Sequence, residues 1–123
     1  MVAGGLNSID NPILYSTGQT MSLIRQARAQ AVAKTSAYTV SALSPQEIVV
    51  SYAEKCSDEN RITAHRLALK LPTEVALTDI HWSVCFNSRG LADDNLTIDL
   101  IDLEENQMSV EVLLGGAVRV DGR

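Results

Sequence analysis

One segment near the amino terminus is suited to form a helix, and no later segment has the same character. Residues 17–34 are rich in Ala, Gln, Arg, Leu and Met, which are good helix formers. Apolar residues recur in this segment at spacings of three and four, the period of one helix face: Met21, Ile24, Ala27 and Ala31. We therefore expect a helix over about 17–35, with Thr17 or Thr20 capping its start.

The rest of the chain has the character of short strands in sequential order. After Ser36 the apolar period changes to two, and β-branched and aromatic residues replace the helix formers. Polar turns separate the runs, and the Gly115-Gly116 pair supplies the positive φ of a tight hairpin. The expected strands cover about 38–42, 47–53, 66–71, 81–86, 96–103, 108–114 and 117–120.

Strands that follow a helix, instead of alternating with helices, indicate an α+β fold with an antiparallel sheet. We expect one N-terminal helix packed on six to seven short strands, arranged in one sheet or in two small ones. A chain of 123 residues has the size of one domain, so residues 17–123 are expected to form a single globular unit, with its strands over about 37–121. Residues 1–16 are interpreted as either a leader segment or residues introduced by cloning.

Charge and hydropathy argue against two classes of protein. The chain has 15 acidic and 10 basic residues and a net charge of −5, whereas a nucleic-acid binder needs clustered Lys and Arg. No run approaches the roughly 18 apolar residues of a membrane span, and the amino terminus lacks the basic start and apolar block of a signal peptide. We expect a soluble chain, either cytosolic or separated from a targeting or anchoring segment.

The two cysteines, Cys56 and Cys85, leave two interpretations open on the residues alone. They could be small buried hydrophobic side chains in a reducing compartment. They could equally form a disulfide in an oxidising one. Neither belongs to a CxxC pair, so zinc binding and thioredoxin-like chemistry have little support.

No catalytic, metal or cofactor motif is visible in the sequence. His65 and His81 have no ligand-like spacing, and HExxH, GxSxG, Walker A and GxGxxG patterns are absent. One acidic loop could offer oxygen ligands to calcium, but it lacks the EF-hand spacing and a solvated loop explains it more simply; its members are Asp93, Asp94, Asn95 and Asp99. We expect no catalytic residue and no cofactor, and favour an interaction module over an enzyme.

Charge is unevenly distributed along the second half of the chain. The segment 91–114 contains seven acidic residues and no Lys or Arg, so a surface formed by it should repel DNA. Arg119 and Arg123 follow this segment and could touch phosphates. The carboxyl-terminal tail nevertheless lacks the density of cations and the aromatic residues of a single-strand binder.

Three motifs, in their order along the chain, resemble the GspH/FimT family of type IV pilin-like minor subunits. The helix contains Ala27-Arg28-Ala29-Gln30-Ala31, which matches the ARxxA pattern of that family. The stretch Phe86 to Gly90 matches an F-x-x-x-G turn, and Gly116 to Val120 matches a G-x-V-R-V-like hairpin. The resemblance extends from about Thr17 to the end of the chain.

This resemblance implies a minor pilin or pseudopilin, a non-catalytic subunit that initiates, or lies near the tip of, a type IV pilus or a type II secretion pseudopilus. Members of the family carry a prepilin leader, a methylated N-terminus and a hydrophobic helix. That helix anchors the subunit in the inner membrane and later packs in the filament core, while the globular domain lies in the periplasm. The implied partners are other pilin or pseudopilin subunits and the membrane, with no cofactor.

The resemblance also bears on the cysteines and on DNA. A domain outside the inner membrane lies where disulfides form, which implies a bridge between Cys56 and Cys85. Some FimT members bind DNA through a C-terminal G-R-x-R motif, but here Gly116-Ala117-Val118-Arg119 has alanine in place of the first arginine. Only Arg119, with Arg123 as an unaligned extra, carries over as a candidate DNA contact. The alternatives to a pilin subunit are a DNA receptor at a pilus tip and a small soluble ligand-binding domain or enzyme.

Overall fold

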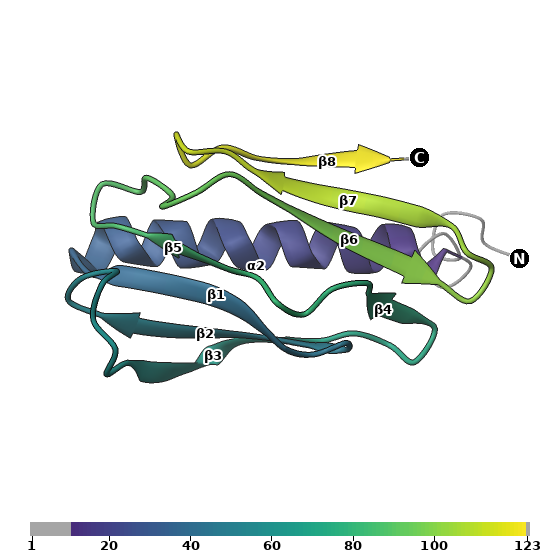
Figure 1. Cartoon of the computed structure of the whole chain (residues 1–123), viewed down its shortest axis with the longest axis horizontal. Helices are drawn as coiled ribbons and strands as arrows, with labels where there is room; N and C mark the ends of the chain where they lie inside the picture. Colours follow the sequence, from purple (N-terminus) through teal and green to yellow (C-terminus); the bar gives the residue numbers. More distant parts are fainter. Residues whose placement is uncertain (1–10, 123) are drawn as a thin grey trace, which may run out of the picture.

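Helix α2, Pro12–Lys34, runs the length of the molecule and lies against two β-sheets (Figure 1). The computed structural model describes residues 11–122. The helix begins at Pro12, earlier than expected, because Asn11 caps it: its side-chain oxygen accepts a hydrogen bond from the Leu14 N–H at 3.3 Å. Proline suits the first helical position, where the backbone needs no donor. Residues 12–16 of the segment 1–16 are therefore helical, and residues 1–10 lie outside the described part.

The two threonines expected to cap the helix lie within it instead. The hydroxyl of Thr17 donates to the carbonyl oxygen of Ile13 at 2.6 Å, and that of Thr20 donates to the carbonyl oxygen of Ser16 at 2.8 Å. Both threonines are buried. Because each hydroxyl is satisfied by its own helix, these polar side chains can face the core without an unpaired donor.

The apolar stripe predicted for the helix is its core-facing side. Ile24, Ala27 and Ala31 have no exposed surface, while Met21 lies at the margin and is partly buried. Since two of these side chains are alanines, the strands can approach the helix axis closely. The helix ends at Lys34, and Thr35 follows in the left-handed conformation with φ 53°.

Eight strands follow within the described residues: β1 Ala37–Ser44, β2 Glu47–Ala53, β3 Ile62–Lys70, β4 Val75–Leu77, β5 Ser83–Phe86, β6 Leu96–Asp102, β7 Gln107–Val112 and β8 Val118–Gly122. They form two antiparallel sheets of four strands. Sheet I has the order β3-β2-β1-β5, and sheet II has the order β4-β6-β7-β8. The predicted α+β class, with one N-terminal helix packed on antiparallel strands, is confirmed. The described strands number eight instead of six or seven, and they form two sheets, which was one of the two expected arrangements.

Both sheets turn one apolar face toward α2. In sheet I, Val40 is in register with Val50 on β2 and with Val84 on β5, and all three are buried. In sheet II, Val110 is in register with Ile98 on β6, and both have no exposed surface. Burial alternates along β2 and β6 with the period of two that the sequence shows, whereas the first four residues of β1, Ala37 to Val40, are all buried.

The structure corrects several strand boundaries. Strand β4, Val75–Leu77, was not expected, because three residues are too few to show a period. Strand β3 begins at Ile62 instead of residue 66. Its register against β2 shifts between Val49 and Ser51, so that residues 64–67 bulge and interrupt the alternation. Strand β5 begins at Ser83 instead of residue 81, and β7 ends at Val112 instead of residue 114.

Candidate functional site

The three motifs that carry the family resemblance meet around one side chain, that of Arg28 on α2. Its Nε donates a hydrogen bond of 2.7 Å to the carbonyl oxygen of Gly90, in the turn after β5. Gly116, in the hairpin between β7 and β8, is also in contact with this pair. A Cβ added at Gly116 would lie 2.2 Å from the Gly90 oxygen and 2.3 Å from the Arg28 Nε. The arginine therefore occupies space that only glycine leaves open.

Backbone conformation gives a second reason for glycine at these two positions. Gly90 has φ +80° and Gly116 has φ +93°, a region that side chains with a Cβ rarely adopt. A Cβ at Gly90 would also lie 3.0 Å from the Val32 side chain of α2. The two turns thus close tightly on the carboxyl-terminal half of the helix.

Beside this contact, α2 and the β7–β8 hairpin form the walls of an open pocket of about 360 Å³. One Nη of Arg25 donates to the carbonyl oxygen of Val118 at 3.1 Å, which fixes this second guanidinium at the pocket. Neither Arg25 nor Arg28 is paired with a carboxylate of residues 11–122. The pocket is lined by Arg25, Arg28, Ala29, Gly116, Ala117 and Val118. Sequence reasoning missed this site, although Arg28 was part of a recognised motif.

Arg119, the candidate DNA contact, forms an ion pair with Glu111. The two residues are directly opposite each other on β8 and β7. The adjacent carboxylate offsets the guanidinium charge that a phosphate would need. Arg123, the second candidate, lies outside the residues that the structure describes.

Acidic groups dominate the face of sheet II that carries Arg119. In the next cross-strand row, Asp99 on β6, Ser109 on β7 and Asp121 on β8 are in register. The Ser109 hydroxyl donates a short hydrogen bond to the Asp99 carboxylate. The acidic segment expected from the sequence therefore places carboxylates beside Arg119, in its own cross-strand row and in the next one, which disfavours a polyanion.

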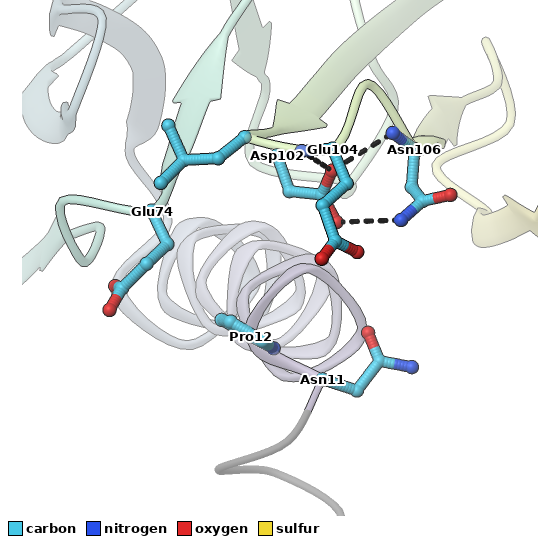
Figure 2. A pocket seen from close by; sticks show the side chains of 7 residues that line it. Asn11, Pro12, Glu74, Asp102, Glu104 and Asn106 are labelled. Carbon is cyan, nitrogen blue, oxygen red and sulfur yellow. Dashed lines mark hydrogen bonds between the residues drawn. The ribbon is translucent and has the colours of Figure 1, made fainter.

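A second pocket, of about 390 Å³, lies at the amino-terminal end of α2 and is acidic (Figure 2). Glu74, Asp102 and Glu104 lie around the start of the helix at Pro12. The Asp102 carboxylate accepts hydrogen bonds from the side-chain amide of Asn106, at 3.0 Å, and from the backbone N–H groups of Asn106 and Glu104, both at 2.9 Å. These hydrogen bonds lower the pKa of Asp102 below its ordinary value. The bond from the Asn106 side chain has the largest effect.

The two cysteines are joined by a disulfide. The Cα atoms of Cys56 and Cys85 lie 5.8 Å apart, and the bond links the loop after β2 to strand β5 across a separation of 29 residues. Cys85 is buried in sheet I. The bond fixes the outer loop of sheet I to the strand that leads into the turn at Gly90.

The histidines and the acidic loop are not assembled into a site. His65 on β3 and His81 before β5 are both exposed. Asp93 is engaged locally, since its carboxylate accepts the backbone N–H of Cys85 at 2.9 Å. Residues 11–122 contain no group of three or more His, Cys, Asp or Glu that could hold a metal ion.

The helix with its two sheets is the GspH/FimT-like fold of minor pilins and pseudopilins. The type IV minor pilin FimU of Pseudomonas aeruginosa has a TM-score of 0.72 and 10% identity over 93% of this chain and 91% of FimU. The minor pseudopilin EpsH of the Vibrio cholerae type 2 secretion system has a TM-score of 0.66 and 10% identity over 91% of this chain and 98% of EpsH. Escherichia coli GspH has a TM-score of 0.69 and 7% identity over 99% of this chain and 96% of GspH.

The likeness is one of structure and not of sequence. No protein-family model matches the chain, and no curated protein matches it. Within the described residues, no helix combines the length and the apolar character needed to cross a membrane. The fold is thus established by superposition over nearly the whole chain.

Proposed function

We propose that this chain is the globular part of a minor pilin or pseudopilin. In this role it is a non-catalytic subunit that helps to initiate, or lies near the tip of, a type IV pilus or a type II secretion pseudopilus. The observation that carries the proposal is the shared fold, which covers more than nine-tenths of both this chain and FimU, EpsH and GspH. FimU is described as a type IV minor pilin, and EpsH as a minor pseudopilin of a type 2 secretion system.

The exposed side of α2 supports a role in assembly. One side of the helix packs on the two sheets, and the other side is uncovered along its length (Figure 1). Leu14 and Tyr15, near the start of the helix, are 49% and 50% exposed, and Val32, which lies beside Gly90 near its end, is 49% exposed. Large apolar side chains on an uncovered helix are suited to contacts with neighbouring subunits.

The proposal includes a hydrophobic helix that precedes α2 and anchors the subunit in the inner membrane. The described domain then lies in the periplasm, where the Cys56–Cys85 bond forms. We expect the gene, upstream of the codon for Leu6, to encode a short basic leader, a Gly-Phe-like junction, a Glu and about twenty apolar residues. Leader removal would leave a methylated amino terminus. A native coding sequence without such a segment would contradict the proposal.

Deletion of the gene tests the assembly role directly. Loss of surface pili and twitching would place the subunit in a type IV pilus, and loss of protein export with pili intact would place it in a secretion pseudopilus. Re-expression of the full-length gene should restore the lost process. A deletion strain that keeps piliation, twitching, DNA uptake and secretion would remove the proposal.

The DNA-receptor alternative predicts an electrophoretic mobility shift at physiological salt that is lost on Arg119→Ala. Because Arg119 is paired with Glu111, we expect no such shift. The enzyme alternative predicts turnover that depends on His65 or His81. Both histidines are exposed and are not part of a group of three or more metal-ligating residues in the described part of the chain.

A further inference from the structure

We infer that the pocket formed by Arg25 and Arg28 receives a carboxylate side chain from a neighbouring pilin-like subunit; this inference rests on the proposed function. The two guanidiniums are three residues apart on one helix and line the same pocket of about 360 Å³. Like charges at this spacing repel each other. An anion placed between them would relieve that repulsion.

The two arginines are oriented by backbone carbonyls and not by acids. Arg28 uses Nε on Gly90 and Arg25 uses one Nη on Val118, which fixes both groups while leaving most of their donors unassigned. Helix α2 itself contains no Asp or Glu, and no carboxylate of residues 11–122 pairs with either arginine. A guanidinium held in this way is suited to bidentate binding of a carboxylate.

The shape of the pocket allows a side chain to enter. Ala29, Gly116 and Ala117 are small, and a Cβ at the neighbouring Gly115 would meet no atom within 4 Å. No aromatic residue lines the pocket, so bases would find no stacking surface. The same hairpin leads into β8, where the Arg119–Glu111 pair lies next to Asp121. These acidic neighbours disfavour an extended polyanion but leave room for a single carboxylate.

A pilin-like neighbour is the occupant that the charges favour. In this chain the acidic turn with Asp102 and Glu104 lies at the start of α2, and the arginine pocket lies about 20 Å further along the helix, at 1.5 Å per residue. Domains of this fold stacked head to tail would bring an acidic turn of one subunit to the arginines of the next. Head-to-tail contacts of this kind build filaments rather than closed dimers.

The test uses the full-length gene in the deletion strain. Arg25→Glu reverses one charge of the pocket, and Arg25→Gln removes it with less risk to folding. Arg66→Glu is the matched control, because Arg66 is also an exposed arginine but lines a different groove, between α2 and β3. We expect Arg25→Glu to lower the number of assembled filaments by at least about tenfold, Arg25→Gln to have a smaller effect, and Arg66→Glu to assemble normally.

A cross-link identifies the partner group. In Arg25→Lys the charge is kept and an amine is introduced, so a carbodiimide should join position 25 to an Asp or Glu of another pilin-like subunit, detected by mass spectrometry. Changing that acid to Lys in the partner should restore assembly of Arg25→Glu.

The outcomes separate the two proposals. Normal assembly of Arg25→Glu and Arg25→Gln in a strain whose deletion abolishes filaments would overturn the pocket and leave the subunit role intact. Equal loss in Arg25→Glu and Arg66→Glu would also overturn it, since the effect would then follow net charge. A DNA mobility shift lost on Arg25→Glu would assign the pocket to phosphate instead. A deletion strain with normal filaments and secretion would remove the proposed function itself.

Discussion

The Nε atom of Arg28 and the carbonyl oxygen of Gly90 are 2.7 Å apart, although the two residues are separated by 62 positions in the chain. This bond ties the helix to the turn after β5, and Gly116 extends the contact to the last hairpin. The three stretches that carry the sequence resemblance are therefore one packing unit. Their shared role is structural: they set the spacing between α2 and two turns.

Gly116→Ala should lower the free energy of unfolding by about 2–4 kcal/mol, measured by urea denaturation. Its new Cβ would overlap the Gly90 oxygen and the Arg28 Nε, in a backbone conformation that disfavours alanine. Gly115→Ala is the matched control, because a Cβ there meets nothing within 4 Å. We expect that control to stay within about 0.5 kcal/mol of the unchanged chain. Equal effects of the two substitutions would contradict the packing described for Gly116.

The Cys56–Cys85 bond should be present in protein purified without reductant. Its intact mass should rise by two hydrogens per chain on reduction, and alkylation before reduction should label no cysteine. Replacing both cysteines with alanine should lower the free energy of unfolding by about 3–4 kcal/mol, since the closed loop spans 29 residues. Two free thiols in the unreduced protein would disprove the bond.

Thr35→Gly should raise the free energy of unfolding by about 1 kcal/mol. Thr35 ends helix α2 at φ 53°, where a β-branched side chain is strained, and its N–H donates to the carbonyl oxygen of Ala31. Glycine adopts this conformation without strain and keeps the hydrogen bond. Ala33→Gly, two residues earlier and at an exposed position inside the helix, serves as the control. It should lower stability by about 1 kcal/mol, because glycine is unfavourable inside a helix.

The turn between β6 and β7 should loosen in acid. The Asp102 pKa is lowered in the folded chain, so the carboxylate stabilises the turn above its unfolded pKa, and this contribution is lost as the pH falls through the lower, folded value. An NMR titration should show the Asp102 carboxyl and the Glu104 and Asn106 amides changing together. The midpoint should lie below the ordinary value of about 3.9. A midpoint at or above that value would show that the hydrogen bonds are absent in solution.

Much of the helix and many of the strands could be predicted from the sequence, because both follow from the spacing of apolar residues along the chain. The stripe of Ile24, Ala27 and Ala31 repeats every three or four residues whatever packs against it. The helix begins before the expected residue 17, and the local signal for this start is Asn11 as a cap followed by proline at the first helical position. Strand β4 could not be predicted, because three residues become a strand only through pairing with β6.

The arginine pocket depends on contacts that a linear sequence does not display. Arg25 reaches Val118 across 93 positions, and nothing in the local sequence of either residue indicates the other. The pairing of Arg119 with Glu111 could have been predicted from the sequence, because the Gly115-Gly116 hairpin determines which residues of β7 and β8 are opposite each other. Counting outward from that turn places the Glu111 carboxylate beside Arg119, the candidate DNA contact.

The loop closed by the Cys56–Cys85 disulfide contains strands of both sheets, although both cysteines lie at sheet I. Between Cys56 and Cys85 the chain forms β3 in sheet I, crosses to sheet II as β4, and returns as β5. In a chain that emerges amino terminus first, both sulfurs are available before β6, β7 and β8 exist. Oxidation can then lock β4 in a covalent loop while its pairing partner is still to come, so the bond constrains the order in which the second half of the molecule assembles.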